Sequence, residues 1–179
     1  CDINPGHLEF AKEFLEVSCP TYTDFEKMMK ETNPELLIVC TVDATHHEFI
    51  IKGMEMGANI LTEKPMTTDE KKIQAILDAE KRTGKHCRVT FNYRYSPHRA
   101  KMWELLHSGE IGELTSVDFH WYLDTSHGAD YFRRWHRLTE KSGSLWVHKA
   151  SHHFDLLNWW IDSDPETVFA LGSLDLYGK

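Results

Sequence analysis

The segment HKASHHFD, residues 148–155, brings three histidines, a lysine and a carboxylate together within a short stretch. Imidazoles and carboxylates can bind a metal or move a proton, so this segment is the first candidate for chemistry. On a helix His148, His152 and Asp155 would share one stripe, with Trp159 one turn further on, because side chains three and four positions apart lie on one face. The pattern therefore predicts an amphipathic helix, and the question is what its polar stripe faces. The opposite stripe is apolar and consists of Ala150, Phe154, Leu157 and Ile161.

A metal site is one interpretation of this helix, because His148 and His152 have the H-x-x-x-H spacing of zinc hydrolases. In that motif a glutamate follows the first histidine and acts as general base. Lys149 stands there instead; it cannot accept a proton at neutral pH and would place a positive charge beside the cation. A two-histidine, one-carboxylate set with Asp155 remains an alternative, and so do hydrogen-bonded histidines without a function. We expect no metal.

A second candidate is Lys64 in the segment LTEKPM, where it lies between Glu63 and Pro65. The segment ends a predicted strand, and proline makes the turn rigid. On its own, E-K-P also fits an ordinary surface turn. E-K-P indicates a functional site much more specifically when it occurs together with VCTVDATHH upstream, FNYRYSP downstream and the histidine segment beyond.

The elements that must position these residues alternate between strands and helices. Apolar and β-branched runs predict strands at 35–41, 58–64 and 85–93, and helical spacing predicts a helix between the first two. The next helix should begin at Thr68 as N-cap and end at Gly84. Such alternation implies a parallel sheet whose carboxyl edge binds ligands, the edge that should carry Thr41, Asp43 and Lys64. Asp2 should end an earlier strand, before a turn at Asn4-Pro5-Gly6 and a helix.

The pattern changes after Tyr95. Residues 96–112 predict a helix, 114–123 alternate like a strand, 124–144 form a polar and aromatic loop, and 167–177 have a closing strand pattern. Strands around a loop and a helix suit a second domain of the α+β class.

The composition of the chain indicates which classes of binding partner it suits. A formal net charge of −8 and the absence of a Lys/Arg-rich block argue against nucleic acid and anionic membranes, and favour a small molecule. No apolar run reaches the roughly 18 to 20 residues that span a bilayer. The cysteines lack a C-x-x-C spacing, and Cys40 falls in a predicted buried strand, so we expect reduced thiols and a cytoplasmic protein.

These segments together resemble the glucose-fructose oxidoreductase / inositol dehydrogenase (Gfo/Idh/MocA) family over essentially the whole chain. Lys64 matches the lysine of the family's E-K-P turn, His152 the histidine of its D-x-x-x-H-x-x-D helix and Asp155 the carboxylate one turn on. His148 stands where the family has aspartate. Thr41 and His46 match a T-P-N-x-x-H segment, although Val42 and Asp43 replace Pro and Asn, and Asn92 and Arg94 match an N-x-R-x-x-P stretch.

The resemblance implies an α/β fold: an incomplete Rossmann-type parallel sheet in residues 1–95, a connecting helix in 96–115 and part of an α+β substrate or oligomerisation domain in 116–179. The family's glycine-rich G-x-G-x-x-G turn is absent, so we expect a fragment that lacks the first β-α unit and the end of the second domain. The cofactor implied is NAD, with NADP as the alternative, because Asp2 matches the acidic residue that bonds the ribose. The cofactor-binding candidates are Asp2, Thr41, His46, Glu63, Lys64 and Asn92.

The activity implied is hydride transfer between the nicotinamide and a sugar or cyclitol hydroxyl. His152 should exchange the hydroxyl proton, Lys64 should polarise the oxygen, and Asp155 should help to hold the site. Substrate contacts are expected from His148, Arg94, Trp135 and Tyr131, the last two by stacking on a sugar face.

Three alternatives stay open. The polar and aromatic loop that carries Tyr131 and Trp135 suits a subunit contact equally well, and we expect a homo-oligomer formed through the second-domain sheet. The second alternative is another activity that this fold supports, glycoside cleavage through transient oxidation by NAD. A metal-dependent hydrolase or a non-catalytic binding module is the third.

Overall fold

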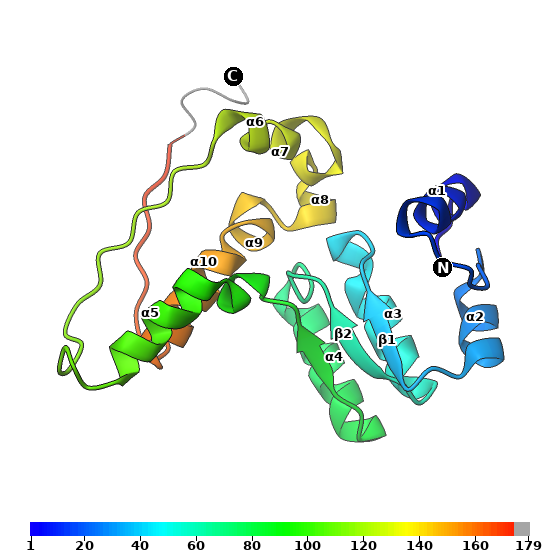
Figure 1. Ribbon diagram of the computed structural model, residues 1–179, viewed down its shortest axis with the longest axis horizontal. Coiled ribbons are helices and arrows are strands. Elements are labelled where there is room, and N and C mark those ends of the chain that lie inside the picture. Colours follow the sequence, from blue (N-terminus) through cyan, green and yellow to red (C-terminus); the bar gives the residue numbers. More distant parts are fainter. Residues whose placement is uncertain (174–179) are drawn as a thin grey trace.

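The computed structural model describes residues 1–173, apart from the side chain of Asp130. Its first half alternates helices and strands, and its second half is built from helices and extended segments (Figure 1). The elements up to the third strand are α1 (Pro5–Leu15), α2 (Phe25–Thr32), β1 (Leu36–Val39), the 3-10 turn η1 (Asp43–Thr45), α3 (His46–Glu55), β2 (Asn59–Thr62), α4 (Glu70–Thr83) and β3 (Cys87–Val89). The later ones are η2 (Asn92–Tyr95), α5 (Pro97–His107), α6 (Thr125–Gly128), α7 (Asp130–Arg133), η3 (Trp135–Arg137), α8 (Thr139–Ser142), α9 (Leu145–His148) and α10 (Ser151–Ile161).

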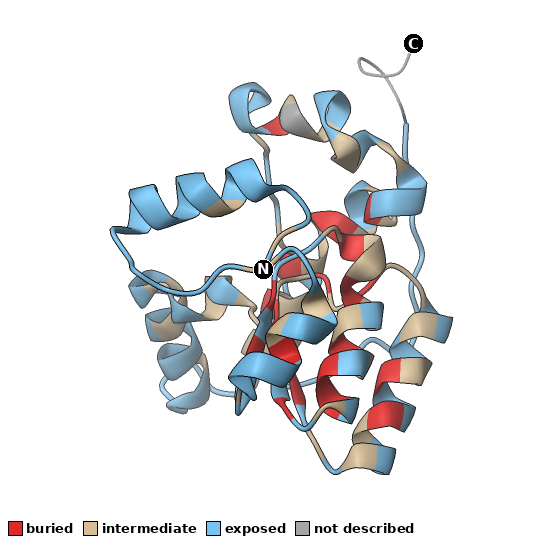
Figure 2. Cartoon of the chain, turned by 90° about the vertical axis from the view of Figure 1, so that its right-hand side faces the viewer, coloured by how far each residue is buried: buried red, intermediate tan, exposed pale blue. Residues whose placement is uncertain are grey.

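The three strands form one parallel sheet in the order β1-β2-β3, which confirms the predicted Rossmann-type α/β arrangement. Helix α3 packs on β1 and β2 and lies beside α4. The buried residues concentrate between these helices and the sheet (Figure 2). Because the strands are parallel, their carboxyl ends lie at one edge, which is where the site residues follow. The core consists of Met29, Leu37, Val39, Ile50, Met54, Ala58, Ile60, Ile76, Ala79 and Cys87.

The start of α4 differs by one residue from its prediction. The N-cap is Asp69, whose carboxylate accepts a hydrogen bond of 3.1 Å from the backbone N–H of Lys72. The hydroxyl of Thr68, the predicted cap, instead accepts a hydrogen bond from the Lys72 ammonium. The helix ends at Gly84 as predicted, in the left-handed conformation that glycine adopts without strain.

The N-terminal turn and the helix after it form as predicted. Asn4 caps α1 by accepting from Gly6 N, and Pro5 opens the helix. Asp2 precedes this turn, and its carboxylate accepts a hydrogen bond from Asn4 N and lies 3.4 Å from the His7 ring. Cys40 differs from its prediction, since it lies just beyond β1 and is exposed.

The second half departs most from prediction. Helix α5 forms as expected, but residues 114–123 carry no strand, and neither do residues 167–173 of the predicted closing strand; residues 174–177 lie outside the described part. Alternating side chains alone do not make a strand, because a ladder needs a partner that supplies the other half of its hydrogen bonds. The expected loop at 124–144 contains the short helices α6, α7, η3 and α8.

The predicted histidine helix is interrupted. His148 ends α9, and α10 begins only at Ser151, so Lys149 and Ala150 form a break. The face of α10 that is buried carries His152 and Leu156, whereas Phe154, expected on the apolar side, is half exposed. The polar stripe therefore faces the protein interior.

Gly53 allows α3 to approach the sheet closely. A Cβ atom at this position would lie 2.7 Å from a methyl carbon of Leu37 and 2.8 Å from one of Ile60. We predict that Gly53→Ala lowers the free energy of unfolding by about 1–3 kcal/mol, because the core must shift to admit the methyl group. Denaturant unfolding of the full-length protein measures the change. Gly128→Ala is the control, since its Cβ would meet Leu123 at an ordinary 3.6 Å; equal losses in both variants would contradict the close approach.

Candidate functional site

Lys64 joins the sheet edge to the second half of the chain. It lies in the loop after β2, and its ammonium donates a 2.7 Å hydrogen bond to the backbone carbonyl of His148. The same ammonium lies 3.4 Å from His148 Nε2. The turn that closes a parallel strand and the end of α9 thus meet, although 84 positions separate the two residues.

A buried carboxylate completes this contact. Asp43 Oδ2 lies 2.5 Å from His148 Nδ1, and Asp43 and His148 are only 3% and 9% exposed. A carboxylate can only accept, so Nδ1 carries the proton and Nε2 is left as an acceptor toward Lys64. The position of Asp43 after a strand predicts that it lies at the ligand-binding edge, but its spacing in the sequence indicates no function. Its partner could not be identified from sequence spacing.

The charges around Lys64 act in opposite directions. Burial lowers the pKa of the Lys64 ammonium most strongly; the carboxylate of Asp43 opposes this, Lys149 lowers the pKa further, and Glu63 raises it again. A lowered pKa means that the ammonium gives up its proton more readily than an exposed lysine does.

His152 is packed among aromatic rings, close enough to Lys64 for the ammonium charge to act on its imidazole. Its imidazole stacks on the Tyr93 ring at 4.0 Å between centroids and meets Phe91 edge-on. Burial and the nearby charge of Lys64, followed by those of Lys149, His153 and Arg99, lower the pKa of His152 to about 3. Its Nδ1 atom is buried without a hydrogen-bond partner in the described structure. His152 is thus a neutral imidazole with a buried ring nitrogen that has no partner among the described residues.

Asp155 and Arg94, predicted as separate site residues, form one ion pair. Arg94 Nε donates to Asp155 Oδ2 at 2.8 Å, and Arg94 Nη2 donates to Asp155 Oδ1 at 2.5 Å. Bidentate pairing fixes both side chains and raises the pKa of Arg94 through its hydrogen bond to the carboxylate. The pair fastens η2, which follows β3, to α10.

The aromatic residues expected to meet a sugar lie against His148. The Tyr131 and Trp135 rings contact the His148 ring edge-on, at 5.5 Å and 5.7 Å between centroids. His136 lies closer, at 4.6 Å, and its pKa is lowered first by burial and then by its electrostatic interaction with His148.

The residues predicted to hold a cofactor divide into two groups. Thr41, Glu63 and Asn92 follow β1, β2 and β3 and retain access to solvent. His46 is 1% exposed, and its ring nitrogens lie 2.8 Å and 2.9 Å from the carbonyl oxygens of Pro65 and Thr41. His46 therefore holds the two strand-end loops together. Asp2 lies in the N-terminal turn before α1.

The described residues contain no group of three or more His, Cys, Asp or Glu side chains that could hold a metal ion. His148 pairs with Asp43 and His152 stacks on Tyr93, so the two histidines of the H-x-x-x-H spacing do not share a ligand position. Across residues 1–173 no helix is long and apolar enough to cross a membrane.

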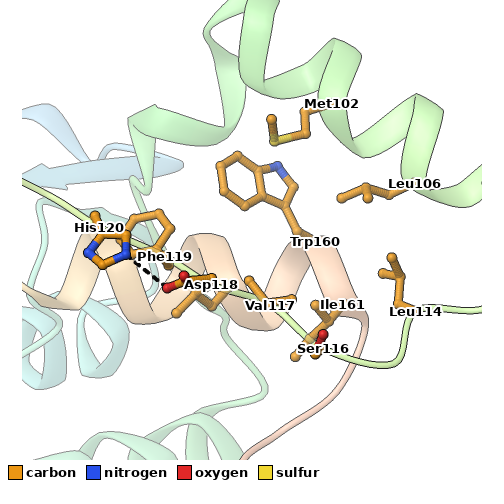
Figure 3. A pocket seen from close by; sticks show the side chains of 11 residues that line it. Met102, Leu106, Leu114, Ser116, Val117, Asp118, Phe119, His120, Trp160 and Ile161 are labelled. Carbon is orange, nitrogen blue, oxygen red and sulfur yellow. Dashed lines mark ion pairs between the residues drawn. The ribbon is translucent and has the colours of Figure 1, made fainter.

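A separate apolar cavity of about 440 Å³ lies between α5, the extended segment 114–120 and α10 (Figure 3). Trp160 and Met102 line it, and it holds none of the predicted site residues. It lies beside residues 114–120, part of the segment where the strand predicted at 114–123 does not form.

Comparisons with known proteins show which family and fold this chain shares. Residues 1–91 match the model of the Gfo/Idh/MocA oxidoreductase family, NAD-binding Rossmann fold, and residues 103–178 match the model of that family's C-terminal alpha/beta domain. YteT of Bacillus subtilis, named as an oxidoreductase, is 45% identical over 93% of this chain and 40% of its own length. An inositol 2-dehydrogenase/D-chiro-inositol 3-dehydrogenase of Lactiplantibacillus plantarum is 26% identical over 94% of this chain and 45% of its own length.

Solved structures share the fold. The myo-inositol 2-dehydrogenase from Lactobacillus plantarum has a TM-score of 0.77 at 23% identity, covering 92% of this chain and 48% of its own. The WlbA dehydrogenase from Bordetella pertussis, in complex with NADH and UDP-GlcNAcA, has a TM-score of 0.74 at 22% identity, covering 90% and 50%. The chain spans about half the length of these relatives or less. The family models cover both halves of the sequence and confirm the resemblance seen in its motifs: the chain belongs to the Gfo/Idh/MocA family of oxidoreductases.

Proposed function

We propose that the full-length protein is an NAD(P)-dependent oxidoreductase that transfers a hydride between a nicotinamide and a hydroxyl of a sugar or cyclitol. The observation that carries the proposal is the contact of Lys64 with His148 across the carboxyl edge of the parallel sheet. An ammonium and imidazoles on a ligand-binding edge suit a reaction in which a hydroxyl must lose a proton. Membership of an oxidoreductase family and the inositol dehydrogenases among the relatives support the substrate class.

The strand ends offer groups that suit a dinucleotide. The hydroxyl of Thr90, directly after β3, is buried without a hydrogen-bond partner in the described chain, and Thr41, Glu63 and Asn92 follow the three strands. We propose that these residues line the cofactor, while His46 positions their loops. When bound, NAD or NADP supplies the hydride acceptor that no side chain provides. Residues 1–95 would be the dinucleotide-binding part and residues 116–179 part of the substrate domain.

Lys64 would polarise the substrate oxygen. A lysine ammonium has three N–H donors, of which one is used by the His148 carbonyl and a second points toward His148 Nε2. The third is available for a hydroxyl. Asp43 acts through His148: by fixing the ring it keeps Nε2 and the carbonyl in place around the ammonium.

His152 would accept the hydroxyl proton. Its low pKa keeps it unprotonated at neutral pH, as a base must be. The same low pKa makes the imidazolium costly, and an alkoxide or another negative group nearby would reduce that cost. Arg94 and Asp155 fix the helix that carries it.

A second candidate is glycoside cleavage through transient oxidation, with no net reduction of the cofactor. One relative, the glycosyl hydrolase family 109 protein 1 of Akkermansia muciniphila, is 33% identical over 51% of this chain, though over only 19% of its own length. Release of an aglycone without accumulation of NADH would favour this activity over net oxidation.

We predict that Lys64→Met and His152→Gln each lower kcat about 100-fold or more in the full-length protein and leave the Kd for NAD nearly unchanged. The losses follow because these groups act on the hydroxyl proton and not on the dinucleotide. NADH absorbance gives kcat and NADH fluorescence gives the Kd. Lys71→Met, at an exposed position on α4, is the control. Near-normal turnover in both site variants would refute the assigned roles.

We predict that Asp43→Asn lowers kcat on the order of 10-fold, since a neutral amide holds the His148 ring less firmly than a carboxylate does. Asp43→Ala should lower it further, because it removes the acceptor altogether. Asp78→Asn, on the exposed side of α4, should have no effect. Unchanged turnover in Asp43→Ala would show that the carboxylate does not act on Lys64 through His148.

We predict that the His152 imidazole does not titrate between about pH 8 and about pH 5, because its pKa of about 3 lies below this window. The ring carbon resonances should stay constant in NMR spectra recorded across the window and should be assigned by their absence in His152→Gln. A titration of the His152 ring with a midpoint near pH 6 would contradict its burial close to cations.

A further inference from the structure

Lys149 is a buried cation that the proposed reaction does not use. It is 9% exposed, and its ammonium donates a 3.0 Å hydrogen bond to the Tyr93 hydroxyl and lies 3.5 Å from His127 Nε2. Neither partner is a carboxylate. Among the described residues no carboxylate forms an ion pair with Lys149. A buried charge without an opposite charge is costly, so an anion from outside the chain would be bound favourably here.

Arg99 is a second cation near the Tyr93 ring. Its guanidinium lies over the Tyr93 ring at 4.1 Å and over the Trp121 ring at 5.5 Å, and it donates to Ser96 Oγ at 3.1 Å. It too has no carboxylate partner in the described part of the chain. The neighbouring cations differ, because Arg94 is paired with Asp155 and Lys64 is close to Asp43. The excess positive charge is therefore local to Lys149 and Arg99.

The two adjacent histidines respond to this charge. Burial lowers the pKa of His153 first, and then Lys149 and Arg99 lower it further; both cations also lower the pKa of His152. Each ring has one buried nitrogen without a partner in the described chain, Nδ1 of His152 and Nε2 of His153. Positive charge and polar atoms without partners thus lie together around Tyr93, and Lys149 and His153 also line a pocket of about 190 Å³.

We infer that the substrate is an acidic sugar, a uronate or aldonate, whose carboxylate binds the Lys149 ammonium next to the Tyr93 hydroxyl. The Lys149 ammonium keeps one N–H beyond those toward the Tyr93 hydroxyl and His127, so it is the group that meets the anion, and Arg99, stacked over the same tyrosine, adds positive charge nearby. This inference rests on the proposed function and narrows it from sugars and cyclitols in general to those that carry a carboxylate.

The test compares each uronate with its parent sugar in the full-length protein, for example galacturonate with galactose and glucuronate with glucose. We expect kcat/KM to favour the uronate by about 10- to 100-fold, the range of one charge-assisted hydrogen bond. Lys149→Met and Lys149→Gln should abolish most of this preference, and Lys149→Arg should keep part of it. Lys141→Met, which removes an exposed ammonium on α8, should leave the preference unchanged.

Three further measurements separate the outcomes. A preference for sugar phosphates over uronates would overturn the carboxylate assignment, and a rise in the Kd for NAD in Lys149→Met with an unchanged sugar preference would assign the ammonium to the cofactor. Equal turnover of neutral and acidic sugars would overturn the inference and leave the proposed function standing. If no sugar reduces NAD, the proposed function fails, and thermal unfolding then tests the inference by itself. The inference stands if uronate raises the Tm of the wild type, while its parent sugar does not. It is overturned if uronate leaves the Tm of the wild type unchanged or raises the Tm of Lys149→Met equally.

Discussion

The contact of the Lys64 ammonium with His148, supported by Asp43, is the interaction on which the site depends. The carboxylate follows β1, the ammonium follows β2 and the imidazole ends α9, so one short network ties the sheet edge to the second half of the chain. A lysine at this depth needs a nearby anion, and the edge of a parallel sheet provides one from the neighbouring strand. The His148 imidazole contacts both groups, so the Asp43 carboxylate holds the ring in the position where it meets the Lys64 ammonium.

The buried and half-buried cations around the site fall into two groups, those with a nearby carboxylate in the described part of the chain and those without one. Around Lys64 and Arg94 each cation has a carboxylate within its network, and these pairs hold elements together. Around Lys149 the cation has only a hydroxyl and an imidazole as partners. Paired cations and a cation without a carboxylate partner among the described residues thus lie in one region, and burial together with the charges of Lys64 and Lys149 keeps His152 neutral.

Local patterns predicted the first half well. Apolar periodicity located β1, β2, β3 and the helices between them, because each element is formed largely by contacts that its own residues determine. The position of Lys64 at a strand end followed from this order. The partner of His148 did not, since Asp43 lies 105 positions away and only the folded chain brings them together. The strand predicted at 114–123 failed for a related reason: side-chain alternation is local, whereas strand pairing is not.

The break after α9 explains how consecutive residues reach different neighbours. In an unbroken helix His148 and His152 would lie on one stripe, one turn apart. With α9 ending at His148 and α10 beginning at Ser151, His148 meets Asp43 and Lys64, Lys149 meets Tyr93, and His152 stacks on the same tyrosine. The interruption lets the buried Lys149 ammonium reach Tyr93 and His127, whereas a regular helix would direct this side chain to another face. The chemistry of the segment HKASHHFD therefore depends on where its helix stops as much as on which residues it contains.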